Sequence, residues 1–379
     1  MLLQGVLPAT KNDHMGNDDK NKPDNRSLHV NKGVEQPSPI NEDALRKFRQ
    51  KRKPRYTTEQ YVEGILRGDR TMLGRAITMI ESSRGEHMET GRQIIEKCLP
   101  YAGNSLRIGI TGVPGVGKST FIEALGTKIT GSGHNLAVLA VDPTSERSGG
   151  SILGDKTRME KLAADPHTFI RPSPSGDSLG GVARKTRETV VLCEAAGFDT
   201  IFIETVGVGQ SETSVHSMVD FFLLLMLAGA GDELQGIKRG IMEMADAIAI
   251  TKADGANRSK AEMAQKEYQK ALHLFPPPDS GWSTRVVTCS ALHNEGIDRI
   301  WETIHEYIRF TRQNGYFIQN RREQAKYWMY ESINQILKDH FYQADFIRKM
   351  LPQYEKEVLE GRKSSFLAAK QLLDAYYGK

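Results

Sequence analysis

The chain has 379 residues, enough for one large domain with extensions or for two domains. Hydrophobic residues make up 39% and charged residues 26%, as in ordinary soluble globular proteins, and the net charge of +4 is too small to argue for a nucleic-acid partner. The three cysteines, Cys98, Cys193 and Cys289, form no CxxC or CxC pair, which argues against a disulfide scaffold and a structural zinc site and favours a reducing compartment.

Neither a membrane helix nor a targeting signal is expected. The longest apolar run, Phe221 to Ala230, is well short of the ~20 residues that cross a bilayer. The start of the chain lacks the basic and apolar regions of a secretory signal, and early acidic residues such as Asp13 and Asp18 argue against a transit peptide. We therefore expect a cytoplasmic protein that binds neither membranes nor nucleic acid.

The first hundred residues divide into a tail and a helical extension. Residues 1–42 are polar and poor in large apolar side chains, which predicts a disordered tail. Helical patterns then predict an N-terminal extension over 43–104, in which Thr57 to Gln60 resembles a capping box. The basic run 46–55 is either a solvated helix end or a surface for an anionic partner.

Residues 105–314 alternate between strand and helix patterns, which predicts an α/β domain with a mostly parallel sheet flanked by helices. The strands lack period-two alternation, as expected when both faces of a sheet are buried. Strands are expected at Leu106–Thr111, Leu136–Val141, Thr200–Glu204, Phe221–Leu227, Ala247–Thr251 and Arg285–Cys289. Helices between them are expected at Ser119–Thr130 and Gly181–Ala196, among others.

A phosphate-binding motif follows the first of these strands. The stretch from Gly112 to Ser119 fits G-x-x-x-x-G-K-[ST] and directly precedes a helix, which is the context of a P-loop NTPase. Lys118 is expected to reach the β- and γ-phosphates and the Ser119 hydroxyl to ligate Mg²⁺. The expected phosphate-binding residues are Gly112, Val113, Pro114, Gly115, Val116, Gly117, Lys118, Ser119 and Thr120.

Acidic residues near the ends of the next strands are the catalytic candidates. Asp142 ends the second strand, Asp155 follows it, and Glu204 ends the third. In a P-loop protein these positions face the γ-phosphate, so the carboxylates are expected to hold Mg²⁺ together with Ser119 or to orient the attacking water. Gly207 would let a backbone N–H approach the γ-phosphate.

The loop Gly229–Gly240 follows the fourth strand and carries four glycines, together with charged residues that include Asp232 and Lys238. Glycines let a loop move at little steric cost. On its residues alone, the loop is either an ordinary solvated connection or a segment that responds to the nucleotide.

Two later segments predict a preference for guanine, so that GTP and GDP are the expected ligands. The fifth strand ends in T-K-x-D, where Asp254 would accept hydrogen bonds from guanine and the stem of Lys252 would lie across the base. Thr251 stands where GTPases usually have asparagine, which weakens the motif. The last strand is followed by Ser290, Ala291 and Leu292, where GTPases place an S-A-x loop beside the guanine.

Residues 315–379 show spaced apolar side chains without any strand pattern, which predicts a tail of two or three helices. The tail carries apolar residues such as Trp328, Leu337, Phe341 and Phe366. A helical hairpin buries little surface by itself, so these residues predict packing against a partner or a second subunit.

From about Gly68 onwards the chain resembles the MeaB/ArgK family of P-loop GTPases. The resemblance rests on four segments: V-D-P-T-S, S-G-G-S-I-L-G-D-K-T-R-M, E-T-V-G-V-G-Q-S-E and A-G-A-G-D-E-L-Q-G-I-K-R-G. It implies a GTPase that serves as a chaperone of the adenosylcobalamin-dependent methylmalonyl-CoA mutase, gating cofactor loading and protecting the mutase from inactivation.

The resemblance also implies roles for single residues. Asp142 and Asp155 match aspartates of the first switch, and Glu204 matches a glutamate that replaces the usual aspartate of the D-x-x-G motif. The loop that contains Asp232 and Lys238 matches a third switch, which couples the nucleotide state to the mutase. Family members are homodimers joined by C-terminal helical arms, which the tail 315–379 would form.

Two alternatives remain open. A metallochaperone GTPase for a nickel enzyme shares the fold class, but it usually needs clustered Cys and His ligands, and here the ten histidines are scattered. A protein kinase of the ArgK type would direct the γ-phosphate to a protein side chain instead of water. Free phosphate or a labelled protein band after incubation with γ-labelled GTP separates these activities.

Overall fold

The computed structural model describes residues 56–82, 84–141, 159–172, 179–205, 211–229 and 235–378, with the backbone alone at 179 and 235–239. Within this part of the chain no helix is both long and apolar enough to cross a membrane. The predicted tail 1–42 and the basic run 46–55 lie outside the described residues.

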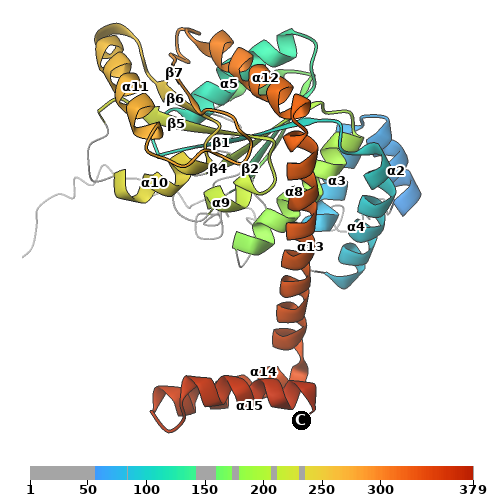
Figure 1. The fold of residues 1–379 in the computed structure, drawn as a ribbon. Coiled ribbons are helices and arrows are strands. Elements are labelled where there is room, and N and C mark those ends of the chain that lie inside the picture. Colours follow the sequence, from blue (N-terminus) through green and yellow to red (C-terminus); the bar gives the residue numbers. More distant parts are fainter. Residues whose placement is uncertain are drawn as a thin grey trace, which may run out of the picture. The chain divides into compact units, whose positions relative to one another are not determined.

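A seven-stranded parallel sheet forms the centre of the structure, in the order β3-β2-β4-β1-β5-β6-β7 (Figure 1). The strands are β1 (Leu106–Gly112), β2 (Leu136–Val141), β3 (Thr168–Arg171), β4 (Thr200–Thr205), β5 (Phe221–Leu227), β6 (Ala247–Thr251) and β7 (Arg285–Thr288). All six predicted strands are confirmed. The seventh, β3, was missed because four residues at a sheet edge give too short an apolar pattern to recognise.

Helices cover both faces of the sheet, so consecutive residues of one strand enter different cores. In β2, Ala137 and Leu139 face one core with α8 (Leu179–Ala195), whereas Leu136 and Val138 face another with α5 (Lys118–Gly131) and α12 (Ile297–Gln313). Figure 1 shows α5 and α12 on one side of the sheet and α8 on the other. The remaining helices of this region are α7 (Glu160–Ala164), α9 (Ser211–His216), α10 (Gln235–Met244) and α11 (Arg258–Leu272).

Three N-terminal helices, α2 (Thr58–Leu66), α3 (Arg70–Glu81) and α4 (Gly85–Cys98), pack on the same face as α8. The predicted capping box is confirmed, because Thr57 accepts a hydrogen bond from the Gln60 backbone and Gln60 accepts one from Thr57. Ile65, Leu73 and Ile77 are fully buried in the core that also contains residues of β2 and β4. The extension therefore shares a core with the sheet.

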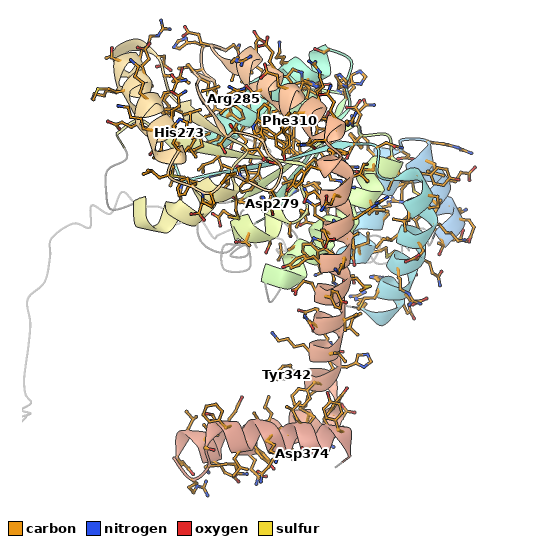
Figure 2. The ribbon with its side chains drawn as sticks, viewed as in Figure 1. His273, Asp279, Arg285, Phe310, Tyr342 and Asp374 are labelled. Atoms are coloured by element: carbon orange, nitrogen blue, oxygen red, sulfur yellow. The ribbon has the colours of Figure 1, made fainter. Side chains whose placement is uncertain are left out.

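The C-terminal region is helical, as predicted, and contains α13 (Tyr316–Gln343), α14 (Asp345–Leu359) and α15 (Ser365–Tyr377). Trp328 of α13 is 7% exposed, and its indole N–H donates to the Ser217 carbonyl oxygen across 3.0 Å. The expectation that Trp328 contributes to an exposed apolar surface is therefore wrong, since the residue packs into the core beside α8. We call the helices α13–α15 the C-terminal arm. In Figure 2, Tyr342 marks the end of α13, and Asp374 marks α15.

The first turns of α13 are held to the turn that precedes β5. Arg321 forms a bidentate ion pair with Asp220, with both nitrogen–oxygen distances at 2.7 Å. The Gln324 amide donates to the Val219 carbonyl oxygen across 2.7 Å. Because these partners are buried, the contacts fix the root of α13 to the domain.

Candidate functional site

The loop between β1 and α5 has the backbone that a phosphate-binding loop requires. Gly117 adopts the left-handed conformation, with φ of 98°, and caps the N-terminus of α5. A Cβ at Gly112 would lie 2.6 Å from the Leu225 carbonyl oxygen, so only glycine fits there. Val116 is fully buried and anchors the loop in the core below it. The loop therefore presents backbone N–H groups and a helix N-terminus at one place.

Lys118, the first residue of α5, reaches back over this loop. Its ammonium group donates to the Gly112 carbonyl oxygen across 2.9 Å. Burial lowers the pKa of Lys118, while the charges of Glu204 and Glu212 oppose that change. The lysine is thus a partly desolvated cation at the mouth of the loop, with two carboxylates in electrostatic range.

Glu204 lies beside the loop because β4 pairs with β1. In the parallel register Glu204 is opposite Ile110, two residues before Gly112. The next residues, Thr111 and Thr205, bring their hydroxyl oxygens within 2.8 Å of each other. The structure therefore brings together the predicted Glu204 and the predicted Lys118.

Glu212 is a site residue that the sequence reasoning missed as a candidate. It lies on α9, is 2% exposed and accepts a hydrogen bond from the Ser211 hydroxyl at 3.4 Å. A buried carboxylate needs a compensating charge or hydrogen bonds, and Lys118 supplies part of this compensation. The signal available in the sequence was its place in the segment E-T-V-G-V-G-Q-S-E.

On the other side of the loop, the end of β6 is tied to the P-loop. The Thr251 hydroxyl lies 2.8 Å from the Val116 carbonyl oxygen, to which it donates. The Lys252 ammonium donates to the Gly115 carbonyl oxygen across 2.9 Å, from a residue with φ of 56°. This left-handed conformation is costly for a lysine and persists where the surroundings fix it. Thr251 thereby links the T-K-x-D motif to the P-loop, although it stands where GTPases usually have asparagine.

The predicted guanine residues are adjacent. The Ser290 hydroxyl donates to Oδ2 of Asp254 across 2.5 Å, and Ala253 N–H donates to the Cys289 carbonyl oxygen across 3.0 Å. Ser290 is buried, whereas Leu292 is exposed. The adjacent strands β6 and β7 therefore bring the T-K-x-D and S-A-x segments together at the C-terminal end of the sheet.

A pocket of 440 Å³ opens beside these elements, between the exposed side of α5 and the loop after β7. Thr120, Ala291 and Leu292, all predicted nucleotide-binding residues, line it. Lys128, Lys161 and Asn294 add polar groups to its wall. Lys118, Lys252 and Asp254 do not line it, so this pocket adjoins the predicted nucleotide site without enclosing it.

Five predicted residues cannot be placed in this site. Asp142, Asp155, Gly207 and Asp232 lie outside the described residues, and Lys238 is described only by its backbone in α10. Among the described residues no group of three or more His, Cys, Asp or Glu side chains is arranged to hold a metal ion. Of the predicted magnesium ligands, Ser119 and Glu204 are among the described residues.

Comparison with known proteins gives a consistent result. The family model described as "Methylmalonyl Co-A mutase-associated GTPase MeaB" matches residues 73–345, more than half of the chain. The Escherichia coli protein named GTPase ArgK is 44% identical over 315 residues, which cover 83% of this chain and 94% of that protein.

A mouse protein named "Methylmalonic aciduria type A homolog, mitochondrial" is 44% identical over 323 residues, covering 83% of this chain and 78% of that protein. Among solved structures, one titled "Crystal structure of LAO/AO transport system kinase" has a TM-score of 0.66 and 36% identity. It covers 84% of this chain and 97% of its own.

Proposed function

Because the chain is a GTPase of the MeaB family, which is associated with methylmalonyl-CoA mutase, we propose that its GTP hydrolysis gates the loading of adenosylcobalamin into that mutase and protects the mutase from inactivation. The observation that carries the proposal is the family match over residues 73–345. A second observation supports it: two hydrogen bonds connect the guanine motif to the P-loop, from Thr251 to Val116 and from Lys252 to Gly115.

In the proposed site, the backbone of Gly112–Thr120 and the Lys118 ammonium hold the phosphates of GTP. Asp254 accepts hydrogen bonds from guanine N1 and N2, and Ser290 keeps its carboxylate in place. Lys252 covers the base with its stem, and the backbone of Ala291 and Leu292 lies beside the base. Adenine has no matching pair of donors, so this arrangement selects guanine nucleotides.

Magnesium fits the donor set, since hydroxyl and carboxylate oxygens are the ligands it prefers. Ser119 and Glu204 would hold the ion, together with Asp142 and Asp155, which match the aspartates of the family's first switch. When bound, the ion neutralises charge on the phosphate oxygens during transfer. Glu204 and Gly207 are proposed to orient the attacking water, because the end of β4 adjoins the P-loop strand.

Coupling to the mutase is proposed to run through the segment Gly229–Gly240. Asp232 or Lys238 would contact the nucleotide site in one nucleotide state only, because a group that contacts both states equally shifts no equilibrium. Lys238→Ala should then leave GTP affinity nearly unchanged while reducing mutase-stimulated hydrolysis. Unchanged stimulation in both Lys238→Ala and Asp232→Ala would remove this segment from the mechanism.

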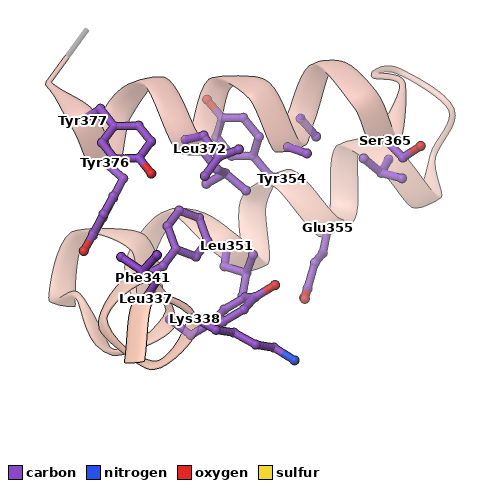
Figure 3. A pocket seen from close by; sticks show the side chains of 15 residues that line it. Leu337, Lys338, Phe341, Leu351, Tyr354, Glu355, Ser365, Leu372, Tyr376 and Tyr377 are labelled. Atoms are coloured by element: carbon purple, nitrogen blue, oxygen red, sulfur yellow. The ribbon is translucent and has the colours of Figure 1, made fainter. Parts of the chain in front are cut away.

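A homodimer is proposed to form through α13–α15. Many large apolar side chains of this arm remain exposed, among them Tyr330, Ile333, Leu337, Leu359 at 87% and Phe366 at 85%. The end of α13, α14 and α15 also enclose an apolar pocket of 510 Å³, with Phe341, Leu372 and Tyr376 on its wall (Figure 3). A second copy that covers this surface would remove it from water.

A kinase activity is the second candidate, because the structural neighbour with 36% identity is titled a transport system kinase. Incubation with γ-labelled GTP distinguishes the two, since a hydrolase releases free phosphate and a kinase labels a protein band. No observation favours the nickel metallochaperone. The predicted cytoplasmic location stays a prediction, and the name of the mouse relative places that protein in mitochondria.

The decisive experiment follows adenosylcobalamin uptake by the apo-mutase through the cofactor's absorbance. Uptake is measured with the chain and GTP, GDP or a non-hydrolysable GTP analogue, and with Lys118→Ala as the control for an inactive site. We expect uptake to depend on which nucleotide is present and GTP hydrolysis to accelerate when the mutase is added. Equal uptake with every nucleotide, together with unstimulated hydrolysis, would overturn the proposal.

A further inference from the structure

Two threonines lie at the C-terminal ends of neighbouring strands in the middle of the sheet, Thr205 as the last residue of β4 and Thr111 as the last but one of β1. Their exposed fractions are 1% and 0%, and their hydroxyl oxygens are 2.8 Å apart, so that one hydroxyl donates to the other. The pair is thus a hydrogen bond between side chains of two adjacent strands, at the end of the sheet where the P-loop begins.

Apolar side chains pack against the neighbouring position on this face of β1. Gly109, two residues before Thr111 and on the same face of β1, lies against Val215 and Val219, which belong to α9 and the turn after it. Valine has the shape of threonine without the hydroxyl, so filling this space does not require a hydroxyl. A buried hydroxyl is costly unless it is hydrogen-bonded, and here one hydroxyl donates to the oxygen of the other.

The position of the pair gives it a role in the reaction. Thr111 directly precedes the P-loop, which holds the phosphates, and Thr205 directly follows Glu204, which is proposed above to act on magnesium or the attacking water. We propose that Thr111 and Thr205 are positioning residues, whose hydrogen bond sets the separation of these two parts of the site and thereby the rate of GTP hydrolysis. The inference rests on the proposed roles of the P-loop and Glu204.

Hydrolysis is more sensitive than binding to this separation. The P-loop, its lysine and the guanine motif hold GDP without help from β4. Attack on the γ-phosphate needs the water and the phosphate in line, and a displacement of about 1 Å can slow such a step ~100-fold. Loss of the Thr111–Thr205 hydrogen bond should therefore lower the hydrolysis rate and leave GDP affinity nearly unchanged.

The test uses the full chain and the isosteric variant Thr205→Val. We expect its single-turnover hydrolysis rate to fall about tenfold, while GDP affinity stays within roughly twofold of the unmodified chain. Thr205→Ser, which keeps the hydroxyl, should restore most of the rate. Thr311→Val is the matched control, because Thr311 is fully buried in α12 and donates to the Tyr307 carbonyl oxygen outside the site.

A double-mutant cycle makes the result specific to the pair. Thr111→Val should reproduce the effect of Thr205→Val, and the double variant should be no slower than either single variant. Additive losses, an unchanged rate, or a loss of GDP affinity that parallels the loss of rate would overturn the inference. If the unmodified chain hydrolyses GTP but fails to control adenosylcobalamin uptake, the proposed function fails and the inference stands. If Thr205→Val hydrolyses GTP at the rate of the unmodified chain, the inference fails, and the proposed function is unaffected.

Discussion

The Ser290 hydroxyl and the Asp254 carboxylate are joined by a hydrogen bond of 2.5 Å that connects the ends of β7 and β6. Ser290 is 1% exposed, so its hydroxyl is fixed by the surrounding backbone. A bridge between Ser290 and Glu295 closes the loop on which the serine lies. The carboxylate proposed to read guanine is therefore oriented before any nucleotide arrives, which reduces the entropy lost on binding.

Guanine selectivity should depend on this pair. Asp254→Asn is expected to shift preference from guanosine to xanthosine nucleotides, because an amide can donate where the carboxylate only accepts. Ser290→Ala should weaken GDP binding about tenfold, since a hydrogen bond to a charged group contributes roughly 1.5–3 kcal/mol. Calorimetric titration with GDP, XDP and ADP measures both effects. Equal affinity of the unmodified chain for ADP and GDP would contradict the assignment.

Nucleotide affinity should fall at alkaline pH. Burial lowers the pKa of Lys118 from that of an ordinary lysine, so the ammonium is present below this lowered pKa and is lost as the pH rises through it. GDP binding should then weaken at a lower pH than the ~10.4 of a free lysine. Fluorescence titration from pH 7 upwards checks this.

Glu212 tests the cause of this dependence of GDP affinity on pH. Its charge raises the pKa of Lys118, so Glu212→Gln should shift the loss of affinity to lower pH. Glu267→Gln changes an exposed carboxylate on α11, away from Lys118, and should leave the profile in place. Identical profiles for Glu212→Gln and the unmodified chain would show that Glu212 does not act on Lys118.

Folding stability should decrease as the pH rises toward neutrality. Burial raises the pKa of Asp246 to about 7, although the Phe222 N–H donates to its carboxylate at 2.8 Å. The folded chain therefore holds a proton between pH ~4 and 7 that the unfolded chain releases, and the stabilisation is lost as pH rises through 7. Asp246→Asn should flatten this dependence in urea unfolding between pH 5 and 8, whereas exposed Asp279→Asn should not.

Assembly should depend on the part of the arm beyond the root of α13. Removal of residues 344–379 should yield a folded monomer, because Arg321, Gln324 and Trp328 keep their contacts with the domain. Removal of 316–379 should instead expose the core around Trp328 and cause aggregation. Light scattering distinguishes these outcomes. A full-length chain that is monomeric at micromolar concentration would contradict the proposed dimer.

The sequence predicted the sheet and the P-loop well because both leave local signals. A parallel strand buried on both faces appears as an apolar run, and a loop that needs left-handed glycines shows them at fixed spacing, as at Gly117. The capping box at Thr57 is equally local. In each of these cases the residues that determine the structure are close together in the chain.

What the sequence did not predict depends on partners distant in the chain. Trp328 has the apolar pattern of an exposed helix face, and only its contact with the turn before β5 shows that it is an anchor. Thr251 looked like a weakened guanine motif, but its hydroxyl finds the carbonyl oxygen of Val116, 135 residues earlier. Glu212 acquires its relation to Lys118 only when α9 packs over β1.

Because α13 is fixed to the domain at Arg321, Gln324 and Trp328, the rest of that helix moves with any change in the direction of its fixed end. About 15 residues separate Trp328 from the helix end at Gln343, which corresponds to roughly 22 Å at ~1.5 Å per residue. A tilt of about 5° at this fixed end would move the far end by ~2 Å. The carbonyl oxygens of Ser217 and Val219, in the turn before β5, hold the fixed end of α13. A small movement of this turn that tilts the helix would therefore become a larger displacement of α14 and α15.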